Sequence, residues 1–189
     1  MIEYLSGKLA SLTAATAVID CGGVGYLLEI SLNTYSAIQT KEEVRLWVHE
    51  VIREDTYQLY GFYNINEREM FRLLLGVSGV GAATARMMLS SLSVDELTSA
   101  IVVQDDKLIK RVKGVGAKTA QRIVLELQDK VSGTASAITP APTVNRNKEE
   151  ALSALTMLGF PKAAADKVLH SLDDSLSVEE LIKQALQKL

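Results

Sequence analysis

Residues 108–127 read LIKRVKGVGAKTAQRIVLEL, and residues 73–89, LLLGVSGVGAATARMML, repeat the same pattern 35 positions earlier. In each copy an apolar stretch leads through Gly-Val-Gly into a second apolar stretch, which predicts a helix, a turn and a helix. Two glycines separated by one residue permit backbone conformations that other residues resist, and they leave backbone N–H groups open to a ligand. The ligand that such a turn favours is an anion.

The second copy is strongly basic. Residues 107–122 include six basic side chains and no acidic one, in a chain whose formal net charge is -3. This concentration favours the polyphosphate backbone of a nucleic acid. Nucleotide-binding motifs do not fit: Ala117 separates Gly116 from Lys118, which breaks the P-loop pattern, and threonine stands where a dinucleotide-binding motif has its last glycine. The predicted DNA contacts are Gly79, Val80, Gly81, Lys113, Gly114, Val115, Gly116, Lys118, Thr119 and Arg122.

The first 63 residues have strand character. β-Branched and aromatic residues concentrate at 4–5, 17–20, 26–30, 44–52 and 57–63. Gly22 and Gly23 lie between two apolar runs and predict a hairpin turn. About five strands in a segment of this size predict a small closed barrel of the OB type. With four basic residues against eight acidic ones, this barrel is a poor general groove for DNA.

One turn of the predicted barrel is acidic. Glu54 and Asp55 fall between the strands expected at 44–52 and 57–63, so their carboxylates should project into solvent from a hairpin tip. An ordinary solvated turn explains them when the barrel is considered alone. A two-metal nuclease site is disfavoured, because neighbouring residues of a strand point to opposite faces.

From residue 64 the apolar periodicity becomes helical, and residues 64–131 predict about five short helices. Asn66 with Glu69, and Ser93 with Glu96, resemble capping boxes. Asp105 is expected to cap the helix that enters the second Gly-Val-Gly. The ten basic and eight acidic residues of this segment give it a net charge of +2, concentrated at that second hairpin.

The rest of the chain predicts a tethered module. Residues 132–147, SGTASAITPAPTVNRN, contain two of the three prolines and no acidic residue, as is typical of a flexible linker. Residues 148–189 predict three helices, at 149–158, 161–172 and 178–189, the last capped by Ser177 with Glu180. A small bundle on a tether suits docking to a partner, and Leu155, Leu158 and Phe160 are its predicted partner-binding residues. They are candidates for an exposed apolar patch, and at least one of them is expected to pack in the core instead. A bundle that only adds stability is the alternative.

In this order, the barrel (1–63), paired hairpins (64–131), linker (132–147) and three-helix tail (148–189) resemble the RuvA family of bacterial Holliday-junction-binding proteins over the whole chain. The residues that carry the resemblance are Leu5-Ser6-Gly7, Arg53-Glu54-Asp55, Leu59-Tyr60-Gly61-Phe62, Gly79-Val80-Gly81, residues 114–120, Ala154-Leu155 and Leu158-Gly159-Phe160. The resemblance implies an α+β multidomain protein with an OB barrel, a tandem helix-hairpin-helix domain and a C-terminal three-helix domain.

The resemblance also implies a function in DNA recombination and repair. It implies a homotetramer, or two tetramers facing each other, whose concave basic face holds the four arms of a DNA junction. Glu54 and Asp55 would then form an acidic pin at its centre. The tail would bind the hexameric ATPase RuvB, with the resolvase RuvC as a further partner, and the chain itself would be non-catalytic and without a cofactor.

The first hairpin departs from the family pattern. The family usually has a lysine where this chain has Ala83, and a proline where it has Ala82. Phosphate binding there is expected to rest on the N–H groups of residues 80–82. The second hairpin keeps Lys118, with Lys113 and Arg122 beside it.

Several other classes compete with a junction-binding protein. Two ordinary helix pairs that need glycine for close approach would explain the repeats without any ligand. A helix-hairpin-helix glycosylase or nuclease would need a catalytic Asp or Lys at a helix start after the second hairpin, where this chain has its predicted linker. A general DNA-tethering module would be monomeric and would not prefer four-way junctions.

Other sites find little support in the sequence. The single cysteine, Cys21, lies in an apolar run and is expected to pack as a small hydrophobic residue. His49 and His170 have no Cys or His neighbours at metal-ligand spacing, so metal chemistry is not expected. No signal peptide and no apolar run of about 18 residues are recognised, which predicts a cytoplasmic protein.

Overall fold

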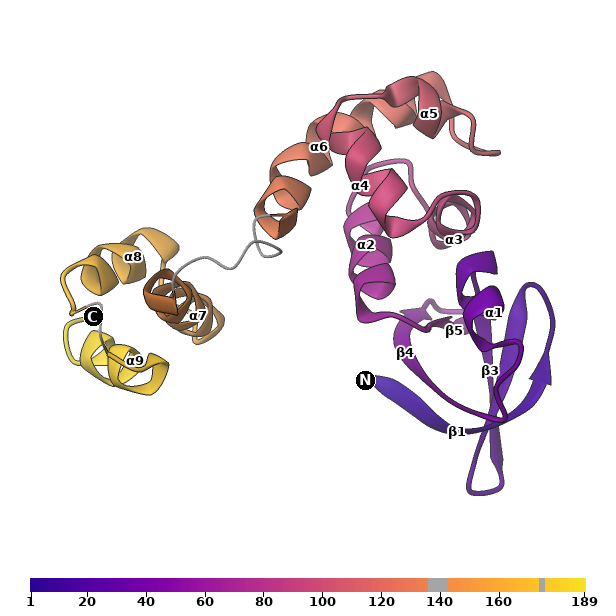
Figure 1. Ribbon diagram of the computed structural model, residues 1–189, viewed down its shortest axis with the longest axis horizontal. Helices are drawn as coiled ribbons and strands as arrows, with labels where there is room; N and C mark the ends of the chain where they lie inside the picture. Colours follow the sequence, from indigo (N-terminus) through magenta and orange to yellow (C-terminus); the bar gives the residue numbers. More distant parts are fainter. Residues whose placement is uncertain (136–142, 174–175) are drawn as a thin grey trace. The chain divides into compact units, whose positions relative to one another are not determined.

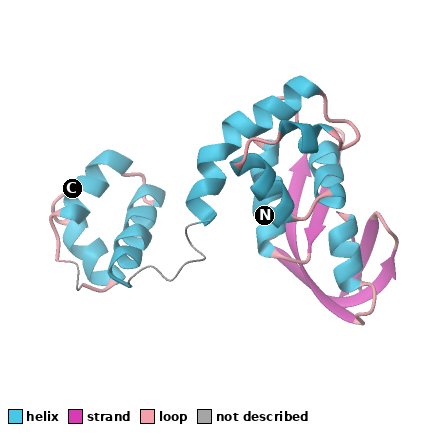
Figure 2. Ribbon diagram, turned by 45° about the horizontal axis from the view of Figure 1, so that its top comes forward, coloured by secondary structure: helices cyan, strands magenta, loops and turns pink. Residues whose placement is uncertain are grey.

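The computed structural model describes residues 1–135, 143–173 and 176–189. These residues form two compact units, Met1–Gly133 and Thr134–Leu189. The first contains a barrel and a set of helices, and the second contains three helices (Figure 1). Figure 2 shows all the strands in the first unit.

Five strands form the barrel, in the order β1-β2-β3-β5-β4. Their bounds are Tyr4–Leu12 (β1), Thr16–Cys21 (β2), Val24–Ile30 (β3), Glu43–Ile52 (β4) and Tyr57–Phe62 (β5). Pairing of β1 with β4 closes the barrel, β3 and β5 run parallel, and the other pairs are antiparallel. The predicted OB-type barrel is therefore confirmed. Its interior is filled by alternating apolar residues, among them Ile19, Leu28 and Leu46.

Two features of the barrel differ from the prediction. β1 runs on to Leu12, well past the predicted strand at 4–5, because its pairing with β2 and β4 overrides the weak strand preference of Ser6, Gly7 and Lys8. Helix α1, Leu32–Ile38, was not predicted and connects β3 to β4. Its start is capped by Ser31, whose hydroxyl accepts a hydrogen bond from the Thr34 N–H.

The helical part of the first unit contains α2 (Ile65–Leu75), α3 (Ala82–Ser91), α4 (Val94–Val102), α5 (Asp106–Lys110) and α6 (Ala117–Ala135). Figure 1 shows α2 and α3 next to the barrel, with α5 and α6 farther from it. The capping box of Ser93 with Glu96 and the cap at Asp105 are confirmed. The predicted cap at Asn66 is wrong. Asn64 caps α2, because its extended backbone continues the strand direction while its side chain accepts the Asn66 N–H.

One core joins these helices to the barrel. Phe71 of α2 packs against Tyr60 and Phe62 of β5, with ring centroids 5.1 and 4.9 Å apart. The same buried cluster continues through α3, α4 and α6 as far as Val131. Because barrel and helices share this core, they pack as one compact unit.

The second unit contains α7 (Thr143–Met157), α8 (Lys162–His170) and α9 (Val178–Leu186), which confirms three helices in the tail. Ala151, Leu155, Leu169 and Leu181 meet in its core. The Ser177 and Glu180 capping box is present as predicted. The segment predicted as a linker, 132–147, is helical at 132–135 and 143–147, because α6 and α7 extend past the expected bounds. Its middle, residues 136–142, lies outside the described residues.

Candidate nucleic-acid interface

The two Gly-Val-Gly turns have the same backbone geometry. Gly79 and Gly114 both have φ of +90°, a conformation that residues with a Cβ rarely adopt. One residue later, the N–H of Val80 donates to the Val77 carbonyl at 3.0 Å, and that of Val115 donates to the Val112 carbonyl at 3.1 Å. The four valines are buried and hold each turn on the helical core. The repeat in the sequence is therefore a repeat in three dimensions, between α2 and α3 and between α5 and α6.

The glycine that ends each turn has a different role. Gly81 is the N-cap of α3 with φ of −91°, and it has no side-chain cap bond. Gly116 has the matching position before α6, and its carbonyl accepts the Ala120 N–H at 2.9 Å, as Gly81 does from Ala85. A Cβ built at either glycine meets no heavy atom within 4 Å. Packing within this chain therefore does not require glycine at these two positions, which is evidence against the close-packing alternative.

Open N–H groups follow both glycines. The first N–H groups of a helix have no partner within the helix and carry a partial positive charge. The turns that hold Gly79, Gly81, Gly114 and Gly116 are exposed, so a phosphate can reach these groups without displacing a side chain.

The hairpins meet each other through α6. Arg122 donates from Nη1 to the carbonyl of Ser78 in the first turn at 3.1 Å, and its Nε lies 3.8 Å from the Glu126 carboxylate. Thr119 lies beside Gly79, with its Oγ1 4.0 Å from a Cβ built there. Arg122 was predicted as a DNA contact, and here it also joins the two hairpins.

The two hairpins differ in the charge of their side chains. Lys113 and Lys118 are exposed, and in the described part of the chain neither has a hydrogen bond or ion pair. Lys107, Lys110 and Arg111 are exposed nearby on α5 and at its end. The first hairpin instead has buried Ala82 and exposed Ala83.

Glu54 and Asp55 lie at an exposed hairpin tip between β4 and β5, as the sequence predicts. The tip is closed by a bond from the Arg53 N–H to the Thr56 carbonyl at 2.8 Å. Thr56 donates its hydroxyl to Asp55 at 2.9 Å, and both acidic side chains face solvent. Below the tip, Ile52 and Tyr57 form an exposed cross-strand pair.

Charged groups that the sequence analysis did not single out connect α2 to the barrel. The buried Glu67 carboxylate accepts hydrogen bonds from the hydroxyls of Ser31 and Thr34. Burial raises the pKa of Glu67, and the two hydroxyl bonds oppose that rise. Arg68 is also buried; it pairs with Glu3 at 2.7 Å and lies over the Trp47 ring, 5.1 Å from its centroid.

In the tail, the three predicted partner-binding residues have different environments. Leu155 is fully buried in the bundle core, so it is the one of the three that packs inside and cannot belong to an exposed patch. Leu158 is 62% exposed and Phe160 is half-buried against the core. Met157, which the sequence analysis missed, is 86% exposed beside Leu158 and lines a shallow pocket with Leu152, Thr156 and Lys162.

The residues that the structure describes contain no group of three His, Cys, Asp or Glu side chains that could hold a metal ion. None of their helices has the length and apolar character needed to cross a membrane.

Comparison with known proteins covers nearly the whole chain. Residues 1–61 match the family model of the RuvA N terminal domain, residues 71–129 a SAM-like helix-hairpin-helix tandem, and residues 146–189 the RuvA C-terminal domain. Proteins named Holliday junction branch migration complex subunit RuvA are similar along their full length and that of this chain. They include those of Bacteroides thetaiotaomicron, 50% identical over 202 residues, Bacteroides fragilis, 48% over 202, and Christiangramia forsetii, 48% over 195. With both hairpins, the barrel and the tail matched, the chain belongs to the RuvA family.

Proposed function

We propose that this chain is a non-catalytic subunit of a branch migration complex that binds four-way DNA junctions through their phosphates. The observation that carries the proposal is the pair of hairpins with identical turns, open N–H groups and glycines that packing does not require. Phosphate contacts of this kind carry no base readout, so the junction is recognised by its shape. The names of the similar proteins support the same function.

Assembly of four copies would place the acidic tips together. Glu54 and Asp55 of each copy then face the crossover, where they repel phosphates and guide the strands apart. Two like charges about 4 to 6 Å apart cost on the order of 1 kcal/mol or more in a well-solvated site. A continuous duplex has to cross this centre, whereas a junction opens around it, so the tips favour the junction.

The tail is proposed to bind the ATPase RuvB, which supplies the work of branch migration. The exposed Met157 and Leu158 beside the pocket lined by Leu152 support a docking role for this end of α7. RuvC is a further proposed partner.

A gel-shift comparison tests the central proposal. A four-way junction and a linear duplex of equal length are titrated at the same salt concentration, and the native mass of the protein is measured in parallel. The expected result is a homotetramer, or a pair of them, that binds the junction more tightly. Equal affinities and a monomeric mass would support a general DNA-tethering module instead. Cleavage or base release would support the enzyme alternative.

A further inference from the structure

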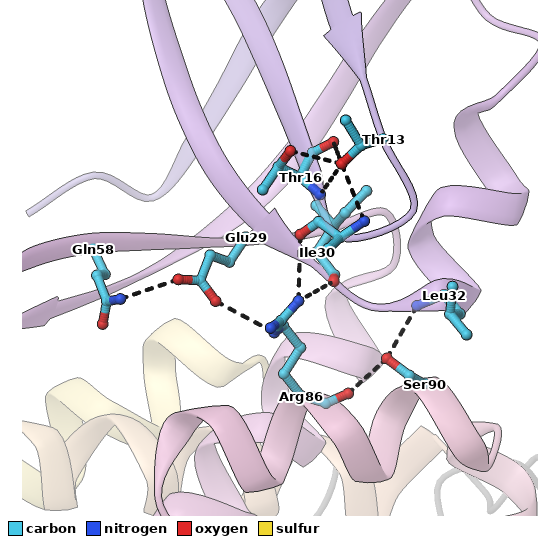
Figure 3. Close-up of polar contacts among 9 residues, drawn as sticks. Thr13, Thr16, Glu29, Ile30, Leu32, Gln58, Arg86 and Ser90 are labelled. Carbon is cyan, nitrogen blue, oxygen red and sulfur yellow. Dashed lines mark hydrogen bonds and ion pairs between the residues drawn. The ribbon is translucent and has the colours of Figure 1, made fainter.

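The network around Arg86 connects the first hairpin to the barrel. Arg86 lies on α3, five residues after the N-cap Gly81, and its guanidinium points toward the barrel strands (Figure 3). Its Nη1 donates to the carbonyls of Ala15 and Ile30, both at 3.3 Å. Its Nε lies 3.3 Å from a carboxylate oxygen of Glu29, close enough for an ion pair, though the angle does not suit a hydrogen bond.

The network extends from Glu29 to the acidic hairpin. The second carboxylate oxygen of Glu29 accepts a hydrogen bond from the Gln58 side chain at 3.0 Å. Gln58 is the second residue of β5, the strand that leaves the tip of Glu54 and Asp55. Arg86 and Glu29 thus link the first hairpin to the strand beneath the tip.

The same face of α3 makes further bonds to α1. The Ser90 hydroxyl donates to the Arg86 carbonyl and accepts the Leu32 N–H at 3.1 Å (Figure 3). Asn33 donates its amide to the carbonyls of Leu89 and Leu92, at 2.6 and 3.1 Å. Because α3 begins at the hairpin turn, these bonds fix the orientation of the turn relative to the barrel.

Arg86 differs from the residues of the first hairpin in its positive charge. In the first hairpin, 76–85, there is no basic residue, so Arg86 is the first cation after the turn. A guanidinium that contacted DNA would be expected to face solvent. This one is only 24% exposed, and it faces two carbonyls and a carboxylate.

We infer that Arg86 is a positioning residue: it contacts no phosphate and sets the place of the first hairpin relative to the acidic tip. This inference rests on the proposed function, in which the hairpin holds a junction arm while the tips occupy the crossover. The hairpin can hold its junction arm while the tips occupy the crossover only if the distance between hairpin and tip is fixed. The Arg86 network therefore contributes to the preference for a junction over a duplex.

The test replaces each end of the ion pair in the full-length chain. Arg86→Gln, Arg86→Lys, Glu29→Gln and the double variant Arg86→Gln/Glu29→Gln are compared with wild type for binding to a four-way junction and a linear duplex over a range of salt. Arg72→Gln is the matched control, because Arg72 pairs with Glu69 within its own helix. Thermal melting identifies the variants that remain folded.

The expected result is a loss of junction preference by about fivefold in Arg86→Gln, typical of residues that couple two sites. Glu29→Gln loses a similar amount, and the double variant loses little more, because both changes break one network. Arg86→Lys restores part of the preference through the ion pair. The slope of log affinity against log salt stays that of wild type, because Arg86 itself neutralises no phosphate.

Two outcomes would overturn the inference while leaving the proposed function in place. A smaller salt slope in Arg86→Gln, with tighter binding in Glu29→Gln, would mean that Arg86 contacts phosphate. Unchanged junction preference in folded Arg86→Gln or Glu29→Gln would mean that the network does not position the hairpin. If Arg86→Gln does not fold, the junction preferences of Arg86→Lys and Glu29→Gln decide whether the network positions the hairpin. A wild-type protein without junction preference would instead refute the proposed function itself.

Discussion

The two hairpins share the backbone geometry of their turns and differ in side-chain charge and in the contacts that hold them. Both turns have a glycine at φ +90° between buried valines, and both end in an exposed glycine before a helix. The first has alanines at its tip and is bonded to the barrel, whereas the second has exposed lysines and is joined to the first through Arg122. The backbone of this turn is thus separable from its charge, and the chain has one copy of the turn with exposed lysines and the other without.

The largest expected effect comes from closing the space above the second turn. The Cβ that Gly116→Val adds meets no heavy atom within 4 Å, and Gly116 does not have the positive φ that requires glycine, so the variant should still fold. A phosphate can then no longer reach the helix N–H groups. Junction affinity should fall by about 30-fold to 100-fold, equivalent to roughly 2 to 3 kcal/mol of charged hydrogen bonds.

Gly81→Val is the paired change in the first hairpin, measured by the same gel shift and the same thermal melt. It should also weaken binding if, as proposed, that hairpin binds phosphate through its N–H groups. Full affinity in folded Gly81→Val would show that the first hairpin is only structural and does not bind DNA as the second is proposed to.

Removing charge from the second hairpin should have the next largest effect. Lys118→Ala takes away an exposed ammonium at the start of α6 and should weaken junction binding by about fivefold, whatever the DNA sequence. The salt slope should fall by about 0.9 for each phosphate that the variant no longer neutralises. Lys188→Ala, near the end of the chain, is the control, and a weakening that depends on base sequence would argue against phosphate binding by Lys118.

Changes at the acidic tip test how negative charge affects DNA binding. Glu54→Gln combined with Asp55→Asn should tighten binding to linear duplex by about fivefold at low salt, the equivalent of about 1 kcal/mol of repulsion removed. The gain for a junction should be smaller, so discrimination falls. Because the Debye length is about 10 Å at 0.1 M salt, the effect should shrink as salt is added. Unchanged duplex affinity at low salt would mean that this is an ordinary solvated turn.

A smaller gain is expected from making the first hairpin resemble the second. Ala83→Lys adds an exposed cation one residue into α3, beside open N–H groups. Junction affinity should rise about twofold to threefold, and the salt slope should become steeper. Ala163→Lys, at an exposed position of α8 in the tail, is the matched control. If Ala83→Lys leaves both quantities unchanged, the first hairpin does not touch the DNA backbone.

Local patterns in the sequence predicted much of this structure. Gly-Val-Gly between apolar stretches specifies a turn within a few residues, and the caps at Ser93, Asp105 and Ser177 act over three residues. The acidic tip followed in the same way from two strands and the residues between them. These features were predictable because the interactions that form them are close in sequence.

The features that were missed depend on residues far apart in the chain. Arg86 bonds Ala15, 71 residues away, and Glu67 bonds Ser31, 36 residues away. Neither contact follows from a local pattern. Leu155 and Leu158 look alike in the sequence, but α7 ends at Met157, so helical periodicity assigns Leu155 to the core and cannot place Leu158.

The smallest expected effect is on the pH dependence of stability, through the contact that attaches α2, the helix before the first hairpin turn, to α1. The pKa of Glu67 is raised from the ordinary value of 4.5 by burial, so the folded chain holds this proton more tightly than the unfolded chain. Stability from this group is therefore complete below the ordinary value and falls as pH rises through the raised one. Glu67→Gln keeps the shape without the charge and should flatten this part of a stability curve measured by urea unfolding.

Glu96 supplies a control of opposite sign. The Ser93 backbone and hydroxyl bonds lower its pKa, so its contribution is present above the ordinary value and is lost as pH falls through the lowered one. Glu96→Gln should therefore remove stability at neutral pH and leave the Glu67 dependence in place. If Glu67→Gln shows the wild-type pH dependence, Glu67 does not titrate within the fold, and the attachment of α2 to α1 is independent of pH. Hydrogen exchange of the α2 amides at two pH values would measure the same attachment locally.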